Sequence, residues 1–316
     1  MSGRKIIAIA GATGAQGGGL ARAILADPNS SFAVRALTRH PDSDKAKQLA
    51  ALGAEVVGAD IDDLASVKQA FSGAYGAFCV TFFWDHFSPA REKAQATNMA
   101  RAAKDASVQH VIWSTFEDTR AYVPLDDTRM PTLQGTYKVP HFDAKAEANR
   151  EFTDLGVPTT FLLTSFYWEN LISFGMGPKR GPDGVLAITM PMGDKKLPGM
   201  ASADIGRFAS GLFKAGREFI GQTVGVAGEH PTGAQMAASL TKALGQPVRY
   251  NAVPPNVYRG FGFPGADDLG NMFQFNAEFE PAYCGHRDLT LVRRLNPAAQ
   301  TFDQWLEENK GRIQID

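Results

Sequence analysis

Three glycines at a spacing of three residues follow a short apolar run, and this arrangement is suited to holding phosphate groups. The run is Ile6 to Ala10, and Gly11-Ala12-Thr13-Gly14-Ala15-Gln16-Gly17 comes directly after it. Where a strand turns into a helix, the first glycine permits the turn, the second lets the backbone approach a pyrophosphate, and the third lets helix and strand pack closely. The positive end of the helix then attracts the phosphates. Because the flanking strand and helix are both present in the sequence, the motif predicts a dinucleotide site.

Arg39, at the end of the next expected strand, favours a phosphorylated dinucleotide. An acid at this place binds the ribose hydroxyls of NAD, whereas a basic residue accommodates the 2′-phosphate of NADP. No carboxylate follows this strand until Asp42. We therefore expect NADP(H), and the alternative is an exposed arginine that merely follows a strand.

Two further strand ends carry candidate contacts. Asp60 and Ile61 follow the third expected strand and suit an adenine contact, although Asp60 could equally cap a helix. Thr81 ends the fourth expected strand, where it would face the pyrophosphate or the nicotinamide ribose.

The usual proton-transfer pair of hydride-transferring reductases is a tyrosine four residues before a lysine. None of the seven tyrosines is followed by lysine at that spacing. Lys145 does lie on an expected helix, and His141 stands one turn before it. His141 could donate the proton, since imidazole titrates near neutrality, or it could be structural in a site without chemistry. No metal-binding spacing of His, Cys and carboxylates is present, and no Gly-x-Ser-x-Gly motif.

Alternating strands and helices would position these residues. Strands are expected at 6–10, 33–38, 55–59, 76–81, 110–114 and 158–163, and helices at 16–26, 44–52, 64–71, 89–105 and 142–155. This order predicts an α/β fold with a Rossmann-type, doubly wound parallel sheet covered by helices on both faces.

The alternation weakens in the second half of the chain. We expect a Rossmann domain over residues 1–165 and a smaller α+β domain over 166–316 on the substrate or partner side, with some exchange of segments. Short helices are expected at 204–214, 232–244, 256–260 and 302–309. Residues 117–139 lack periodicity and exceed the usual connection length, as functional or mobile loops do.

Composition limits the class of protein. A chain of 316 residues with 44% hydrophobic content is globular, and its net charge of -1 argues against direct nucleic-acid binding. No apolar stretch is long enough to span a membrane. Cys79 and Cys284 are far apart and are expected to be reduced thiols, which indicates a cytoplasmic protein.

Several motifs in order carry a resemblance to a known family. They are the glycine motif, Arg39, His141-Phe142-Asp143-Ala144-Lys145 and Tyr167-Trp168-Glu169-Asn170. Over almost its whole length the chain resembles the NmrA-like family, atypical relatives of the short-chain dehydrogenases and reductases. The resemblance implies NADP(H) binding without the usual catalytic tyrosine.

Lys145 and His141, found by the spacing above, are the candidate catalytic residues. Phe82 departs from the pattern, because an asparagine is more usual after the threonine. The expected cofactor-binding residues are Gly11, Ala12, Thr13, Gly14, Ala15, Gln16, Gly17, Arg39, Asp60, Ile61, Thr81, Phe82, Phe83, Lys145, Tyr167, Trp168, Glu169 and Asn170.

Two functions follow from the resemblance. Some members of the family respond to the redox state of the dinucleotide by changing their association with partners, and others are reductases. We therefore expect a sensor of the NADPH/NADP+ state, and the alternative is an NADPH-dependent oxidoreductase of a quinone-like or carbonyl compound. A small aromatic substrate, a regulatory protein and a second copy of the chain stay open as partners.

Overall fold

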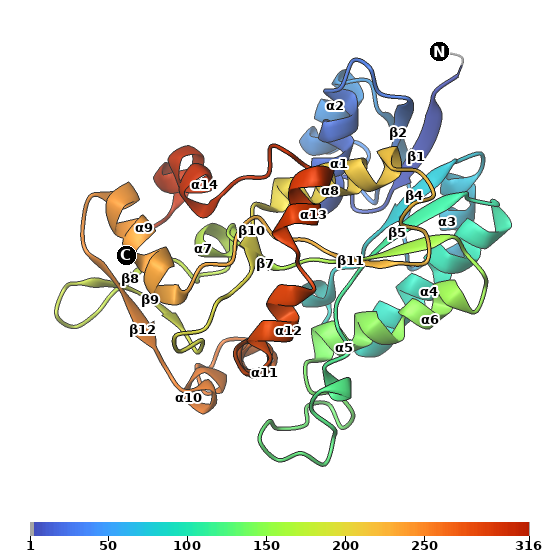
Figure 1. The fold of residues 1–316 in the computed structure, drawn as a ribbon. Helices are drawn as coiled ribbons and strands as arrows, with labels where there is room; N and C mark the ends of the chain where they lie inside the picture. Colours follow the sequence, from blue (N-terminus) through green and yellow to red (C-terminus); the bar gives the residue numbers. More distant parts are fainter. Residues whose placement is uncertain (1–2, 316) are drawn as a thin grey trace. The chain divides into compact units, whose positions relative to one another are not determined.

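The structure, a computed structural model, describes residues 3–315 and divides them into two compact units. The first unit consists of residues 3–118, 141–164 and 203–224, and the second of residues 119–140, 165–202 and 225–315. Residues 119–140 thus lie in the second unit and residues 203–224 in the first. Figure 1 shows the helices and strands of the two units, coloured along the chain from the N-terminus to the C-terminus.

The first unit is built on a seven-stranded sheet with the order β11-β6-β5-β4-β1-β2-β3. The pairings among β1 to β6 are all parallel. The strands are β1 (Lys5–Ile9), β2 (Phe32–Thr38), β3 (Glu55–Gly58), β4 (Gly76–Cys79), β5 (His110–Thr115), β6 (Thr159–Leu163) and β11 (Thr223–Gly225). The expected parallel α/β sheet is thus confirmed, and β11 adds a strand that the sequence pattern did not predict.

The order of the strands fixes where a ligand site is expected. The chain builds the sheet from β1 through β2 to β3, and then returns to place β4 on the other side of β1. In open α/β sheets, ligands bind outside the carboxyl ends of the strands at such a reversal. The carboxyl ends of β1, β2 and β4 are therefore the expected position of a ligand site.

Helices cover both faces of this sheet. They are α1 (Ala15–Leu25), α2 (Asp44–Ala51), α3 (Leu64–Phe71), α4 (Pro89–Asp105), α5 (Pro140–Glu147), α6 (Asn149–Thr153) and α8 (Ser202–Lys214). Alternate residues of β5 point to opposite faces. Val111 and Trp113 lie in a core cluster with residues of α3, α4 and α6, whereas the His110 ring packs against Phe213 of α8. The single helix expected over 142–155 is divided into α5 and α6.

Helices α1 and α8 touch each other through their backbones. A Cβ atom added at Gly206 of α8 would lie 1.9 Å from the backbone nitrogen of Leu20 in α1. One added at Gly19 would lie 2.8 Å from the carbonyl oxygen of Ala203. Glycine at these places is therefore what allows the two helices to pack this closely.

The second unit contains two small sheets and several helices. Strand β7 (Phe166–Tyr167) pairs with β10 (Gly199–Met200), and β9 (Leu186–Met190) lies between β8 (Lys179–Arg180) and β12 (Val248–Ala252). The helices are α7 (Asn170–Ser173), α9 (Gly233–Leu244), α10 (Pro255–Arg259), α11 (Ala266–Glu278), α12 (Glu280–Gly285), α13 (Leu289–Leu295) and α14 (Phe302–Asn309), and the 3₁₀ turns are η2 (Thr119–Ala121) and η3 (Lys310–Arg312).

The long irregular segment between β5 and α5 belongs mostly to this second unit, where α11 holds it. Asn271 Nδ2 donates to the carbonyl oxygens of Pro131 and Lys138, at 2.9 and 2.5 Å. Gln274 Nε2 donates to the Arg129 carbonyl oxygen at 2.9 Å. The segment is therefore tied down by side-chain amides despite its lack of regular structure.

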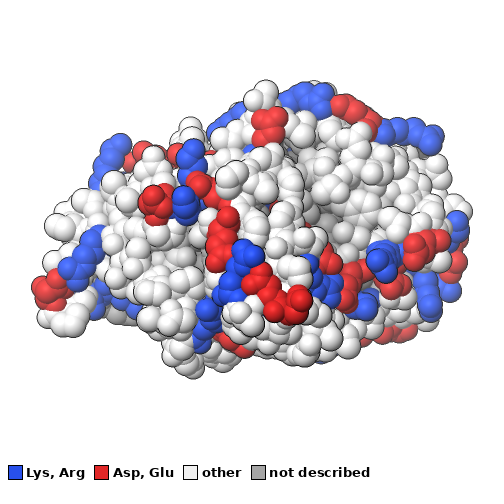
Figure 2. Space-filling view, turned by 60° about the horizontal axis from the view of Figure 1, so that its bottom comes forward, with Lys and Arg blue, Asp and Glu red and all other residues white. Residues whose placement is uncertain are grey.

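Charged residues of both signs are mixed on the surface in Figure 2, where lysine and arginine side chains lie among aspartate and glutamate side chains. This distribution agrees with the near-zero net charge of the sequence. Within residues 3–315, no helix is long and apolar enough to cross a membrane.

Candidate functional site

The turn between β1 and α1 forms a tight cradle, and its last glycine, Gly17, leaves no room for a side chain. Gly11 has a φ of +63°, which favours glycine, and a Cβ atom at Gly17 would lie 2.6 Å from the carbonyl oxygens of Ala10 and Gly11. Gly14 is the N-cap of α1 and brings no side chain to cover the first amide groups. The turn therefore fits the pyrophosphate of a dinucleotide, whose oxygens accept hydrogen bonds from such amides.

Arg39 follows β2 directly, and the structure brings a carboxylate to it that lies far away in the sequence. Its Nη2 atom is 3.6 Å from Oδ2 of Asp85, and both side chains are about half exposed. Asp85 ends η1 (Phe83–Asp85), the short 3₁₀ turn after β4. Arg39 is thus placed where a 2′-phosphate is expected, but it already has an acidic partner.

Asp60 and Ile61 follow β3 as expected, and each has a hydrogen-bond partner within the first unit. Asp60 Oδ1 accepts a hydrogen bond from the backbone nitrogen of Asp62, while the N-cap of α3 is Asp63. The helix-capping alternative for Asp60 is therefore wrong. The Ile61 carbonyl oxygen accepts a hydrogen bond from Asn98 Nδ2 at 3.0 Å. An adenine contact at this pair stays a prediction.

Lys145 of α5 is the centre of a buried polar cluster that also contains Thr81 and Glu92. Its Nζ atom lies 2.5 Å from Thr81 Oγ1, 3.2 Å from the Thr81 carbonyl oxygen and 2.5 Å from Glu92 Oε1. The Thr81 hydroxyl in turn donates to Glu92 Oε1. An ammonium group has three hydrogens, and the cluster supplies an acceptor for each. The ring of Trp113 lies 5.4 Å from the same nitrogen.

Glu92 is completely buried, yet its surroundings keep it ionised. Burial by itself opposes the charge, but the Lys145 ammonium, the nearby His86 ring and hydrogen bonds from Lys145 and Thr81 outweigh it and lower the pKa of the carboxyl group from 4.5 to about 2. The cluster therefore contains a paired positive and negative charge inside the protein.

His86 stands behind Glu92 in a defined orientation. Its Nδ1 atom accepts a hydrogen bond from the backbone nitrogen of Ser88 at 3.0 Å. In a neutral ring this places the proton on Nε2, which lies 3.4 Å from Glu92 Oε2. Among the described residues, Glu92 Oε2 thus has the His86 ring nearby but accepts no hydrogen bond, whereas Oε1 is held by Thr81 and Lys145.

His141 is on α5 one turn before Lys145, as expected, and aromatic rings surround it. The centroids of Trp84 and Phe142 both lie 4.7 Å from that of His141, and the side chain is almost fully buried. Phe82, by contrast, is 56% exposed next to this group, while Phe83 is buried. The exposed ring of Phe82 gives the end of β4 an apolar surface. Proton donation by His141 stays a prediction.

Tyr167 to Asn170 lie in the second unit, and two of their side chains have clear partners there. Trp168 is fully buried against the rings of Phe302 and Trp305. Glu169 accepts hydrogen bonds from the backbone nitrogen of Ser202 at 2.8 Å and from Trp305 Nε1 at 3.1 Å. These two side chains therefore help to hold the second unit together, and their contact with a cofactor stays a prediction.

Sequence reasoning missed Asp85, His86 and Glu92. A signal for Glu92 was present, because helical spacing places it on the same face as Ala96 and Met99, which are buried. An acid in the first turn of a helix is usually explained by its favourable interaction with the helix dipole. Its position alone therefore does not indicate that Glu92 pairs with Lys145. Asp85 and His86 carry no comparable local signal.

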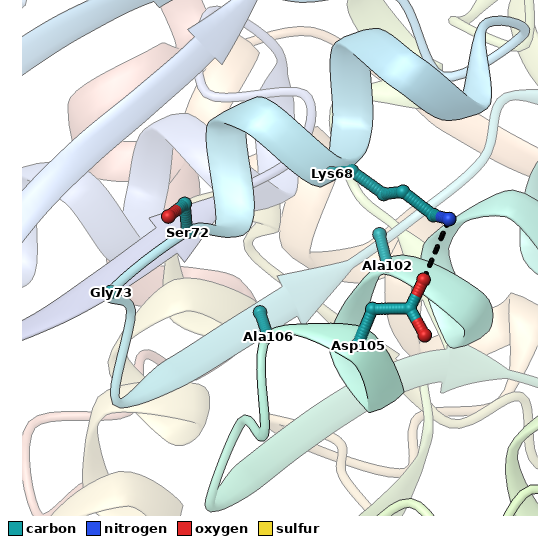
Figure 3. A pocket seen from close by; sticks show the side chains of 6 residues that line it. All are labelled: Lys68, Ser72, Gly73, Ala102, Asp105 and Ala106. Carbon is teal, nitrogen blue, oxygen red and sulfur yellow. Dashed lines mark ion pairs between the residues drawn. The ribbon is translucent and has the colours of Figure 1, made fainter.

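A hollow of about 320 Å³ lies elsewhere on the first unit, between α3 and α4 (Figure 3). The Lys68–Asp105 ion pair crosses it, with 2.7 Å between Nζ and Oδ2. Its lining residues belong to the carboxyl-terminal parts of the two helices and the residues after them. Since these helices run antiparallel to the strands, the hollow is at the edge of the sheet opposite to the glycine turn. It is not part of the candidate site.

Comparison with known proteins assigns the chain to a family whose profile covers nearly its whole length. The sequence profile of the NmrA-like family matches residues 3–306. The chain is 29% identical over 299 residues to the NmrA-like family domain-containing oxidoreductase lnbB of Aspergillus flavus. The alignment covers 89% of this chain and 86% of that protein.

Two solved structures show the same fold. NmrA, a negative transcriptional regulator solved in complex with NADP, has a TM-score of 0.78 at 24% identity, covering 97% of this chain and 95% of that one. Triphenylmethane reductase of Citrobacter sp., complexed with NADP(H), has a TM-score of 0.75 at 18% identity, covering 96% and 99%.

Proposed function

The chain belongs to the NmrA-like family, and on this premise we propose that it binds NADP(H) at the carboxyl ends of β1, β2 and β4 and responds to the redox state of that dinucleotide. The observation that carries the proposal is the glycine turn, in which backbone atoms occupy the space that a Gly17 side chain would need. A turn of this kind at the start of a helix is suited to a pyrophosphate.

The residues of the first unit have distinct parts in this proposal. The glycine turn would hold the pyrophosphate, Arg39 the 2′-phosphate, and Lys145 with Thr81 the ribose next to the nicotinamide. NmrA solved with NADP and the triphenylmethane reductase solved with NADP(H) share this fold, and this supports the choice of ligand.

A sensing role is favoured over catalysis by what surrounds Lys145. Its partners are Thr81, Glu92 and the ring of Trp113, and none of them is a tyrosine. The hydrogens of its ammonium group already have acceptors inside the protein. Such a site can bind a dinucleotide without having an obvious proton donor for a substrate.

Reduction of a flat, quinone-like molecule is the second candidate, and the exposed Phe82 ring favours it. An aromatic side chain at the end of β4 could stack on a planar acceptor. The fungal relative lnbB is called an oxidoreductase. When bound, NADPH would supply a hydride, while Lys145 would orient the ribose and His141 or a water molecule would supply the proton.

The first experiment is calorimetric titration of the protein with NADPH, NADP+, NADH and NAD+. A sensor needs unequal affinity for the two redox states, because a ligand shifts an equilibrium only through differential affinity. We expect at least a tenfold difference between NADPH and NADP+. Similar affinities would contradict sensing and turn attention to NADPH oxidation with quinones, whereas no binding of any dinucleotide would refute the proposal as a whole.

Replacement of Arg39 by alanine tests the phosphate contact. Loss of a charge-assisted hydrogen bond should cost about 1.5–3 kcal/mol, or roughly ten- to a hundredfold in NADPH affinity, with little change for NADH. The matched control is Arg249→Ala, since Arg249 is also a half-exposed arginine with one aspartate partner, in the second unit. Equal NADPH affinity in the Arg39 variant would contradict the assignment.

A further inference from the structure

The pairing of Glu92 with Lys145 is the most strongly buried charge interaction near the candidate site. Glu92 is 0% exposed and Lys145 is 6% exposed. They come from α4 and α5, and the end of β4 contributes Thr81 to both. Contacts from three elements define one position for the lysine side chain.

A buried ammonium group depends on a counter-charge. Removal from water disfavours the charged form of a lysine, and a carboxylate in contact restores it. Thr81 offers only neutral oxygens, and the Trp113 ring attracts the cation weakly at 5.4 Å. Glu92 is therefore the group that balances the charge on Lys145.

The other charges on the surrounding elements do not replace Glu92 in this role. On α4, Arg91 pairs with Asp62 and Lys93 pairs with Glu147. Burial raises the pKa of the Cys79 thiol, so this neighbour of Thr81 stays neutral. Among the other titratable groups on these elements, His86 faces Glu92, and His141 and Asp143 share α5 with Lys145. Arg101, Lys104 and Asp105 lie in the last part of α4, more than two turns after Glu92.

We propose that Glu92 is a positioning residue, which keeps Lys145 protonated and fixed at the end of β4 so that a charged Lys145 can bind NADP(H). This inference rests on the proposed function. The longest of the lysine contacts, 3.2 Å to the Thr81 carbonyl oxygen, is the weakest and the first that a dinucleotide hydroxyl would exchange. The contact with Glu92 then remains and anchors the side chain.

The test is the pH dependence of NADPH affinity, measured by calorimetry from pH 6 to pH 9. For each variant, we compare its Kd with that of the wild type at the same pH and use the ratio of the two values. The ratio cancels the effect of ligand titration on Kd, because this effect is the same for both proteins. In Glu92→Gln the ratio should rise about tenfold with pH, because the lysine loses its proton without the carboxylate. In Lys145→Ala the ratio should be high at every pH.

Two further variants separate charge from shape. Glu92→Asp retains the carboxylate, so its ratio should be independent of pH even if it is above one. Glu147→Gln removes a carboxylate half a turn after Lys145 on α5 and should give a ratio near one throughout. Circular dichroism and thermal unfolding would establish that each variant is folded.

The outcomes are distinct. A pH-independent ratio for Glu92→Gln would mean that the carboxylate is only structural, and this would overturn the inference. If Glu92→Gln does not fold, the Lys145→Ala ratio still decides, since a fall toward one at high pH would show that wild-type Lys145 loses its proton despite Glu92. No NADPH binding by the wild type would instead refute the proposed function.

Discussion

Asp85→Asn should increase the preference of the protein for phosphorylated dinucleotides. In the structure, the Asp85 carboxylate lies 3.6 Å from the Arg39 guanidinium, the group expected to bind the 2′-phosphate. The phosphate and Asp85 therefore compete for one cation. A carboxylate in this place also resembles the acid that accepts the ribose hydroxyls in NAD-specific sites, so its removal should weaken NADH binding.

The size of the effect follows from the exposure of the pair. Side chains that are 54% and 51% exposed form an ion pair in contact with water, and such pairs contribute about 0.2–1 kcal/mol. Release of Arg39 should thus tighten NADPH binding roughly one and a half- to fivefold. Loss of a hydrogen bond to the ribose, of about 0.5–1.5 kcal/mol, acts on NADH in the opposite direction. Together, these two effects should raise the ratio of NADPH affinity to NADH affinity at least about threefold.

The assay is calorimetry with NADPH and NADH at low salt and at about 1 M salt. Because the Debye length is about 3 Å at 1 M salt, the gain in NADPH affinity should nearly disappear there. Asp105→Asn is the matched control, since its side chain is 54% exposed, pairs with one lysine and lies at the opposite edge of the sheet. An unchanged ratio in Asp85→Asn, or an equal rise in the control, would refute the reasoning.

Two further predictions concern stability. The pKa of Glu92 is about 2 in the folded protein and 4.5 in the unfolded reference, so its charge stabilises the fold by roughly 3 kcal/mol above pH 4.5, and this is lost as the pH falls toward 2. In urea unfolding, Glu92→Gln should therefore be less stable than the wild type at pH 7, with a smaller difference at pH 3; a constant difference would contradict this origin. Gly17→Ala should destabilise by about 1–3 kcal/mol and abolish NADPH binding, because its Cβ atom meets two backbone oxygens at 2.6 Å, whereas Gly285→Ala, with open space around it, should leave both calorimetric binding and unfolding unchanged.

The sequence was most informative where the determinants are local. The glycine turn follows from residues within one strand–helix connection, and Lys145 was placed on its helix because α5 follows a recognisable strand. Arg39 was found in the same way, by its distance from the motif. In each case neighbouring residues carry the signal for the backbone conformation.

What could not be predicted depends on residues that are distant in the chain. Asp85 meets Arg39 only because β4 inserts next to β1, and Glu92 meets Lys145 only because α4 and α5 lie on the same side of the sheet. The segment over 117–139 was expected as a loop, but no local pattern shows that amides of α11 hold it.

The contact of α8 with α1 also has a consequence for the newly made chain on the ribosome. Synthesis delivers β1 to β6 by residue 163, but α8 and β11, which complete the first unit, come only at residues 202–225. Until then α1 exposes the surface at Gly19 and Leu20 that α8 will cover. At about 5–20 residues per second, the incomplete unit must wait several seconds for its last helix. A nascent chain stalled between these points should be the form most in need of a chaperone.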